Sequence, residues 1–103
     1  MMGGYEHGQG ARLRSLRDYL GLSAKEIADE LGVSIRSYQN FESGRAAIPT
    51  GVLNEVADMV HKLDELAGAY SEQDELSLAG MTTIQRRAAG IAAAANPELR
   101  LTS

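Results

Sequence analysis

From residue 11 onward, the hydrophobic residues of the chain recur every three or four positions, which is the spacing of amphipathic helices. A first stripe, made of leucines, lies within residues 11–20 and is followed by Gly21. A second stripe of Ala, Ile and Leu lies within residues 24–31 and is followed by Gly32. The strict alternation of hydrophobic and polar residues that marks a half-buried strand does not occur. The pattern therefore predicts an all-α protein.

Small polar residues stand where these helices should begin. Ser23 is followed three positions later by Glu26, a spacing in which each side chain bonds to the backbone amide of the other residue. Ser34 is expected to cap a third helix over residues 34–43, and Gly44 is expected to end it. The third helix should direct its two aromatic residues toward the core, and these are Tyr38 and Phe41.

The fourth predicted helix is the longest. Its hydrophobic residues follow a 4-3-4-3-4 spacing, and they are Val52, Val56, Met59, Leu63, Leu66 and Tyr70. A helix that continues to Ser71 is about 30 Å long. Residues 72–81 break the pattern. Thr82 or Thr83 then starts a short Ala-rich helix, which is expected to run from Ile84 to about Ala95.

Acidic residues are concentrated in the second half of the chain. The net charge is −4 at pH 7, and the sequence pI is about 5.1. Residues 11–50 hold six basic and five acidic residues, whereas residues 51–103 hold four basic and eight acidic ones. This balance argues against a protein that coats DNA non-specifically, because such binding depends on positive charge. It leaves open a sequence-specific DNA-binding site in the first half.

Several functional classes find no support in the sequence. The chain has no cysteine, which excludes disulfides and thiolate metal sites and fits a reducing cytoplasm. His7 and His61 are far apart, so no metal site is expected. No stretch reaches the roughly 18 apolar residues of a membrane span. No phosphate loop or nucleophile motif points to an enzyme or a cofactor. The glycine-rich Met1–Gly10 is expected to be a disordered tail.

Short motifs at fixed spacing carry a family resemblance. They are Gly-Leu-Ser at 21–23, Leu-Gly-Val-Ser at 31–34, and Glu-x-Gly-Arg at 42–45 followed by Ile-Pro. Over about residues 11–50 the chain resembles the Cro/lambda-repressor (Xre-type) helix-turn-helix family. A looser resemblance links it to a subgroup of phage- and plasmid-borne regulators that includes anti-CRISPR-associated and antitoxin-like repressors. The resemblance implies a lambda-repressor-like DNA-binding domain of four to five helices, with a C-terminal helical extension.

The resemblance also implies that the third helix contacts DNA bases. Arg36 and Asn40 occupy positions at which the family contacts base edges, and Ser37 and Gln39 occupy secondary positions. Arg can bond guanine O6 and N7, and Asn can bond adenine N6 and N7, each with about 1–3 kcal/mol of discrimination. Ile35 stands where family members often carry a polar base contact. Its side chain either packs on a thymine methyl group or covers the core.

Other positions match structural and phosphate contacts of the family. Ser34 and Arg45, at the two ends of the third helix, correspond to residues that hold DNA phosphates, and Lys25 is expected to do the same. Arg17 and Glu42 match an ion pair that ties the first helix to the third. The resemblance therefore supplies both a binding face and the contact that orients it.

Together the residues and the resemblance predict sequence-specific binding of double-stranded DNA and repression of transcription at an operator, without a cofactor. The alternative is a protein-interaction module of the antitoxin type, with weak or vestigial DNA binding and a toxin as its partner. The acidic second half favours this alternative, and so does Ala24, which stands where many family members carry a phosphate-binding Gln. The presence of Arg36, Asn40 and Arg45 argues against it.

A homodimer is also expected, because one helix-turn-helix contacts too few base pairs to select a site in a genome. The predicted domains are a tail (1–10), a helix-turn-helix domain (11–51) and a dimerisation region (52–103). The expected dimer contacts lie beyond the reach of the first core, and they are Leu63, Leu66, Tyr70, Ile84 and Ile91. In the other arrangement, the last helix folds back on the fourth within one chain. The protein is expected in the cytoplasm, as a bacterial or phage-encoded protein without a membrane partner.

Overall fold

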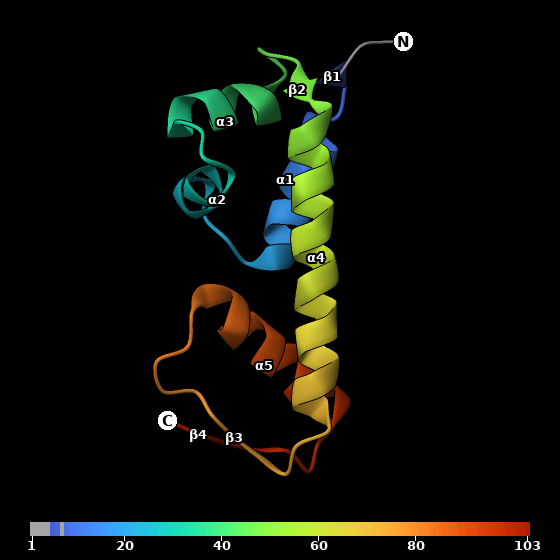
Figure 1. The fold of residues 1–103 in the computed structure, drawn as a ribbon, viewed down its shortest axis with the longest axis vertical. Coiled ribbons are helices and arrows are strands. Elements are labelled where there is room, and N and C mark those ends of the chain that lie inside the picture. The colour runs from blue at the N-terminus through green and yellow to red at the C-terminus, as the bar shows by residue number, and fades with distance from the viewer. Residues whose placement is uncertain (1–4, 7) are drawn as a thin grey trace. The chain divides into compact units, whose positions relative to one another are not determined.

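The computed structural model describes residues 5–6 and 8–103. Most of them lie in helices (Figure 1), which are α1 (Gly10–Leu20), α2 (Ala24–Leu31), α3 (Ile35–Ser43), α4 (Thr50–Ser71) and α5 (Thr83–Ala95). The strands are short, and they are β1 (Tyr5–Glu6), β2 (Ile48–Pro49), β3 (Glu75–Ser77) and β4 (Arg100–Thr102). The predicted helical fold with a C-terminal helical extension is confirmed, and the strands are additions to it.

The chain divides into two compact units, and the division falls inside α4. The N-terminal unit is Met1–Val60 and the C-terminal unit is His61–Ser103. The first half of α4 therefore belongs with the helix-turn-helix, and its Val56 is fully buried. The sequence predicts this boundary near residue 51 instead, before most of the helix.

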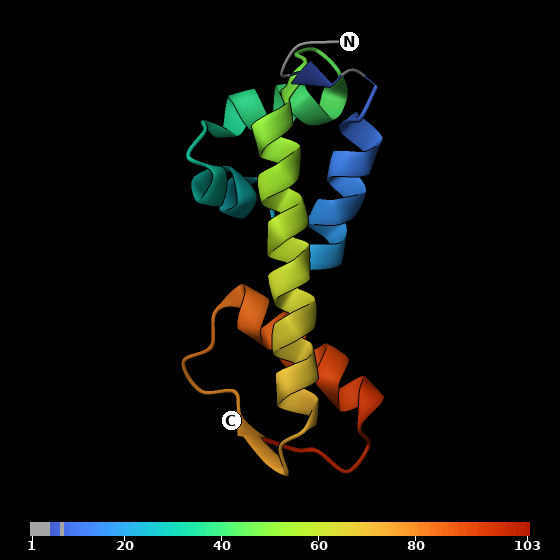
Figure 2. The ribbon, with the colours of Figure 1, turned by 45° about the vertical axis from the view of Figure 1, so that its right-hand side comes forward.

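Within the N-terminal unit, α3 packs against both α1 and α2. In the view of Figure 2, α1 is seen apart from the corner that α2 and α3 form. The largest fully buried side chains of this unit come from the predicted apolar stripes and from the segment before α4, and they are Leu13, Leu20, Ile27, Tyr38, Ile48 and Val56. The core therefore holds one face of each of these helices and leaves the opposite face to solvent.

The predicted helix caps in this unit are present. The Ser23 hydroxyl accepts a hydrogen bond from the Glu26 amide at 3.1 Å, and the Glu26 carboxylate accepts one from the Ser23 amide at 2.9 Å. Gly32 ends α2 with a φ of 71°, in the left-handed region that favours glycine. Ser34 caps α3 directly afterwards. Only Gly32–Ser34 separates the two helices, which makes the corner between them tight.

The segment before α1 pairs with the segment before α4. Strand β1 runs antiparallel to β2, and α1 begins at Gly10. The prediction of a disordered tail over residues 1–10 is wrong for β1 and for Gly10, whereas residues 1–4 and 7 lie outside the described part of the chain. A two-residue strand has too few positions to show alternation, so the hydrophobic pattern gave no sign of it.

Gly10 lies where the start of α1 closely approaches the end of α3. A Cβ atom at this position would lie 2.9 Å from the carbonyl carbon of Glu42 and 3.0 Å from the carbonyl oxygen of Phe41. Both are backbone atoms of a packed helix, which cannot turn aside as a flexible side chain can. The close approach of α1 to α3 therefore requires a residue without a Cβ.

We expect Gly10→Ala to lower the free energy of unfolding by about 1–3 kcal/mol, because the added methyl group overpacks the junction of α1 and α3. Gly68→Ala is the matched control, since Gly68 lies in α4 with open space around it. That variant should gain about 0.5–1 kcal/mol from the better helix propensity of Ala. Urea denaturation followed by circular dichroism measures both. An unchanged midpoint for Gly10→Ala would contradict the close contact.

In the C-terminal unit, β3 and β4 lie side by side as a parallel two-stranded sheet (Figures 1 and 2). A buried cluster joins this sheet to α5, and its members are Leu76, Ala89, Ala92 and Leu99. Tyr70, Leu78 and Met81 pack against the cluster and are partly buried. Neither strand was predicted, because three-residue strands that pair across more than twenty residues leave no local signal.

Helix α5 is capped at its start and tied to α4 at its end. The Thr82 hydroxyl accepts a hydrogen bond from the Gln85 amide at 3.2 Å, and the Gln85 side chain accepts one from the Thr82 amide at 2.8 Å. The Asn96 amide group donates to the carbonyl of Ser71, the last residue of α4, at 3.0 Å. The last helix therefore folds back on the fourth within one chain, as in the second of the two arrangements that the sequence left open.

The burial of side chains within one chain changes the list of expected dimer contacts. Leu63 is fully buried, so the prediction that it forms a dimer contact is wrong. Tyr70 packs against the cluster of its own chain. Leu66, Ile84 and Ile91 are half-buried, and a role for them in a dimer stays a prediction. The end of the apolar stripe of α4, at Tyr70, therefore belongs with the core of the C-terminal unit.

Candidate nucleic-acid interface

The corner between α2 and α3 fixes the start of α3. The Ser34 hydroxyl accepts a hydrogen bond from the Ser37 amide at 3.0 Å and donates one to the Ser37 hydroxyl at 3.0 Å. The first amide groups of a helix have no acceptor within the helix, and they favour anions such as phosphate. Ser34 engages one of these amides, so the first turn is ordered before any ligand binds.

Helix α3 has a buried face and an exposed face. Tyr38 is completely buried, and Phe41 is 9% exposed. Arg36, Ser37 and Gln39 are exposed, and Asn40 is half-buried. With 3.6 residues per turn, these four polar residues follow one side of the helix. The sequence-predicted base contacts are therefore brought together on one surface, opposite the aromatic residues that anchor the helix.

Ile35 begins the helix and lies beside this polar surface. Its side chain is 44% exposed, which makes it one of few large hydrophobic residues on the described surface. Of the two roles left open for it, covering the core does not fit this exposure. The apolar surface of Ile35 is instead available for contact with another molecule.

The positive charges near α3 differ in their partners. Within residues 8–103, the guanidinium groups of Arg36 and Arg45 form no ion pair, and both residues are exposed. Lys25 pairs with Asp29 at 2.8 Å, one turn along α2, and this hydrogen bond raises the pKa of Lys25. Because that pair is exposed and worth little, Lys25 can exchange its partner for a phosphate at small cost.

The predicted ion pair between Arg17 and Glu42 is present. Arg17 Nε donates to Glu42 Oε2 at 2.7 Å, and Arg17 Nη2 donates to Glu42 Oε1 at 3.2 Å. The two bonds form the parallel, bidentate arrangement that guanidinium and carboxylate groups favour. The side chains are only 17% and 15% exposed, so solvent screens the pair little. This contact ties α1 to α3.

Two further contacts extend the ion pair into a network. The Tyr38 hydroxyl donates to Glu42 Oε2, and Arg17 Nη1 donates to the carbonyl of Leu22 in the turn after α1 at 3.1 Å. Burial alone would raise the pKa of Glu42, but the hydrogen bonds from Arg17 and Tyr38 outweigh it and hold that pKa below its ordinary value. Burial, with the bond to Glu42, raises the pKa of Tyr38. The network holds α3 in one orientation.

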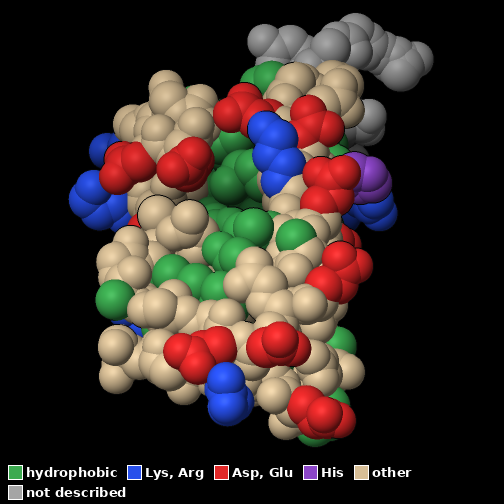
Figure 3. Space-filling model, turned by 60° about the horizontal axis from the view of Figure 1, so that its bottom comes forward, with side chains coloured by type: hydrophobic (Ala, Val, Ile, Leu, Met, Phe, Trp, Pro, Cys, Tyr) green, Lys and Arg blue, Asp and Glu red, His purple; other side chains and the backbone are tan. Residues whose placement is uncertain are grey.

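Acidic side chains are scattered over the face that Figure 3 draws, and basic ones are few there.

In the part of the chain that the structure describes, no group of three or more His, Asp or Glu residues is arranged to hold a metal ion. None of the helices described has the length and apolar character that crossing a membrane requires. His7, one of the two histidines, lies outside the described residues.

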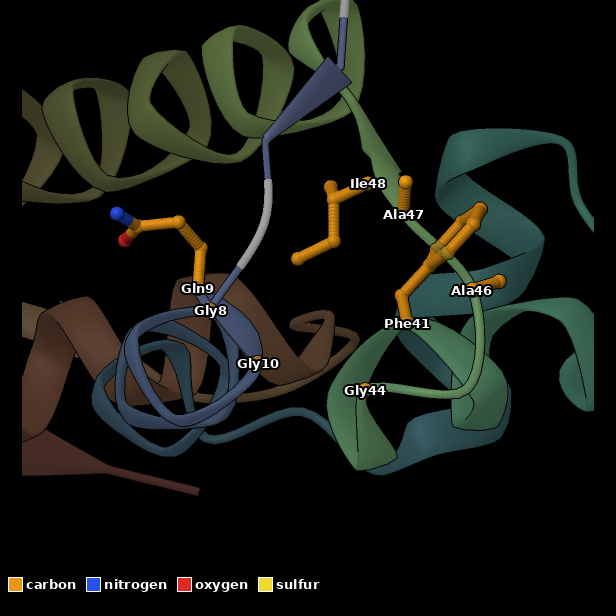
Figure 4. Close-up of a pocket in the computed structure, with 8 residues that line it drawn as sticks. All are labelled: Gly8, Gln9, Gly10, Phe41, Gly44, Ala46, Ala47 and Ile48. Atoms are coloured by element: carbon orange, nitrogen blue, oxygen red, sulfur yellow. The ribbon is translucent and has the colours of Figure 1, made fainter.

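A small pocket lies between the end of α3 and the segment before α1 (Figure 4). Its lining comes from the segment before α1, the end of α3 and the loop that leads to β2, and it consists of Gly8, Gln9, Gly10, Phe41, Gly44, Ala46, Ala47 and Ile48. The cavity has a volume of about 30 Å³, which is the space of about one water molecule. It is too small for an organic cofactor.

Two short helices joined by a tight three-residue turn, the second with one anchored face and one exposed polar face, define a helix-turn-helix. The sequence model of the helix-turn-helix domain family matches residues 10–76. The chain therefore belongs to this family of DNA-binding regulators, as its resemblance to Xre-type proteins predicts.

Two curated relatives come from phages. The chain is 37% identical to the Aca2 repressor of Pectobacterium phage ZF40 over 62 residues, which cover 59% of this chain and 53% of the relative. It is 34% identical over 70 residues to the cryptic phage CTXphi transcriptional repressor RstR of Vibrio cholerae, which covers 65% of this chain and 62% of the relative. The chain thus spans between half and two thirds of the length of these relatives.

Two contacts of the network that orients α3 are not among the sequence-based predictions. Tyr38 is predicted only as a core residue, although the four-residue spacing between Tyr38 and Glu42 places both side chains on one face of the helix. The bond from Arg17 to the carbonyl of Leu22 is the other. That second bond depends on how the chain turns after α1, and no residue type in the sequence signals it.

Proposed function

We propose that the protein is a transcriptional repressor that binds a specific operator in double-stranded DNA. The observation that carries this proposal is the exposed polar face of α3, whose opposite face is buried and held by the Arg17–Glu42 ion pair. A helix of this kind enters the major groove, where each base pair presents a distinct pattern of donors and acceptors. Occupation of the operator then excludes the transcription machinery.

In the proposed complex, Arg36 and Asn40 provide direct base recognition. Arg36 is exposed and its guanidinium is unpaired within residues 8–103, so it is available for a bidentate contact with guanine. Asn40 is half-buried and suits a bidentate contact with adenine. Ser37 and Gln39 supply secondary contacts. Ile35, with its exposed apolar side chain, packs on a thymine methyl group.

Phosphate contacts position the helix without selecting a sequence. We assign them to Ser34 at the start of α3, Arg45 just after its end and Lys25 on α2. The exposed guanidinium of Arg45 is the strongest of these candidates, because it needs to give up no partner among residues 8–103. No cofactor takes part in this mechanism.

We expect Arg45→Ala to weaken binding to all DNA sequences by a similar factor. The slope of log K against log salt concentration should become shallower by about 0.9, since one phosphate contact is lost. Arg86→Ala, which removes an exposed charge from α5, is the matched control and should leave the slope unchanged. Fluorescence anisotropy titrations of labelled duplexes at several salt concentrations measure both. Equal slopes for Arg45→Ala and the unaltered protein would remove Arg45 from the interface.

The repressor acts as a homodimer in this proposal, with the C-terminal unit joining the two copies. One α3 helix contacts only a few base pairs, and two copies related by a two-fold axis contact half-sites about 34 Å apart. A partner protein of the toxin type is the second candidate, and the acidic balance of residues 51–103 favours it. Co-purification of such a partner in place of DNA would support that alternative.

A further inference from the structure

Strand β4 has a free edge in the C-terminal unit. The sheet formed by β3 and β4 has two strands in the described part of the chain, so β4 has a neighbour on one side only. All three of its residues are exposed. An edge strand presents unpaired backbone groups that can pair with another chain. A two-stranded sheet is also marginally stable in water.

The hydrogen bonds of the sheet show which residue of β4 faces the free edge. The Arg100 amide donates to the Asp74 carbonyl at 3.0 Å, and the Leu78 amide donates to the Thr102 carbonyl at 2.7 Å. Arg100 and Thr102 therefore direct their backbone groups toward β3. Because alternate residues of a strand direct these groups to opposite sides, the amide and carbonyl of Leu101 point away from the sheet.

Leu101, whose backbone groups face the free edge, also has an exposed apolar side chain. Leu101 is the register partner of Leu76, so both side chains lie on one face of the sheet. Leu76 is 8% exposed and belongs to the core cluster, whereas Leu101 is 40% exposed. Leu101 thus continues the cluster to the edge of the sheet. Natural edge strands often protect such a position with lysine or proline, and β4 carries leucine there.

We propose that β4 pairs antiparallel with β4 of a second copy of this chain, with the two-fold axis at Leu101. The inference deepens the proposed function and rests on it, since it names the surface that joins the two halves of the repressor. Each Leu101 donates its amide to the carbonyl of the other, which forms one hydrogen-bonded pair. The two sheets merge into one of four strands, in the order β3-β4-β4-β3, and the two leucine side chains cover each other.

The second copy is the occupant that this edge fits best. A two-fold axis at Leu101 places Arg100 opposite Thr102 of the other copy, so no like charges face each other. Arg100 is also paired with Glu75 of its own chain at 3.2 Å, which leaves the edge without net charge. The strand is therefore complementary to itself in hydrogen bonding, in apolar surface and in charge, as an interface between identical copies must be.

Two substitutions of equal charge test this pairing. Leu101→Glu places two carboxylates against each other at the axis, and we expect it to abolish the dimer. Thr102→Glu places each carboxylate opposite Arg100 of the other copy, and we expect it to keep the dimer. Sedimentation velocity at tens of micromolar should give about twice the 11.0 kDa of the chain for the unaltered protein and for Thr102→Glu. Circular dichroism checks that each variant is folded.

Because the chain has no cysteine, a single introduced thiol reports the register directly. The Cα atoms of a hydrogen-bonded antiparallel pair lie about 5.5 Å apart, a separation that a disulfide can bridge. Leu101→Cys should therefore form a covalent dimer when an oxidant is added. The two Thr102 positions would lie about 8 Å apart, from the strand spacings, so Thr102→Cys should cross-link much more slowly.

The outcomes separate this inference from the proposed function. A folded Leu101→Glu that stays dimeric, or equal cross-linking of the two Cys variants, would overturn the β4 pairing and leave DNA binding untouched. A monomeric unaltered protein would overturn it as well. Loss of the dimer in Leu101→Glu, together with weaker binding to a two-fold symmetric DNA site and unchanged binding to a half-site, supports both proposals. Absence of DNA binding by an intact dimer would contradict the proposed function alone.

Discussion

Glu42→Ala is expected to lower the free energy of unfolding of the N-terminal unit by about 3 kcal/mol. Removing one partner of a poorly solvated ion pair leaves the other charge without compensation, and here the Arg17 guanidinium and the Tyr38 hydroxyl both lose their acceptor. A loss of this size shifts the melting temperature of a small domain by more than about 10 °C. Thermal and urea denaturation followed by circular dichroism measure the change.

The exposed pair between Lys25 and Asp29 supplies the matched control for Glu42→Ala. Its side chains are 73% and 66% exposed, so Asp29→Ala should leave the free energy of unfolding nearly unchanged. The pH dependence gives a second check. Because the pKa of Glu42 is lowered in the folded protein, its contribution is complete above the ordinary glutamate pKa and is lost as the pH falls through the lowered value. Glu42→Gln should lack this part of the acid destabilisation. Equal effects of Glu42→Ala and Asp29→Ala would contradict the role of the network.

Arg36→Ala is expected to weaken binding to the operator by about 1–3 kcal/mol, which is roughly 5- to 150-fold. The loss should be confined to the specific site and should relax the preference at one base pair, because a bidentate contact to guanine selects that base. Anisotropy titrations with the operator and with single-base variants of it measure both effects.

Arg36→Lys separates the charge from the geometry of the contact. Lysine keeps the positive charge but lacks the planar fork, so base selection should fall while non-specific affinity is retained. Ser37→Ala should cost less than Arg36→Ala, since the Ser37 hydroxyl already has a partner in Ser34. A folded Arg36→Ala variant that binds the operator with unchanged affinity and preference would show that Arg36 does not contact bases.

The parts of the fold that could be predicted are those whose signal is local in the sequence. Ser23 and Glu26 lie three residues apart, and their reciprocal cap follows from this spacing. The buried Tyr38 and Phe41 follow from the helical period in the same way. In each case one short segment contains both the cause and the structural result, so no knowledge of the rest of the chain was needed.

The parts that could not be predicted depend on contacts between distant segments. The pairing of β3 with β4 joins residues 25 positions apart, and three-residue strands carry no periodic pattern. The same limit explains the wrong assignment of Leu63 to a dimer. Its place on an apolar stripe was correct, but only the three-dimensional structure shows that its side chain is fully buried within one chain.

The arrangement of residues on α3 could be predicted, but the contacts that hold α3 against α1 could be predicted only in part. The family resemblance supplied the pair of Arg17 and Glu42, and the helical period supplied the exposed face with Arg36 and Asn40. The close approach at Gly10 had no sequence signal, because a glycine near the chain start looks like any flexible residue. Glycine is instead required there by the backbone of α3.

Selection of bound duplexes from a random DNA pool, followed by sequencing, determines whether the protein binds DNA sequence-specifically. We expect one enriched site with two-fold symmetry and half-sites about one helical turn, or 34 Å, apart. The same selection with Arg36→Ala should return a motif that is degenerate at one position in each half-site. A pool that shows no enrichment after repeated rounds with the folded, full-length chain would contradict the claim that this protein binds DNA sequence-specifically.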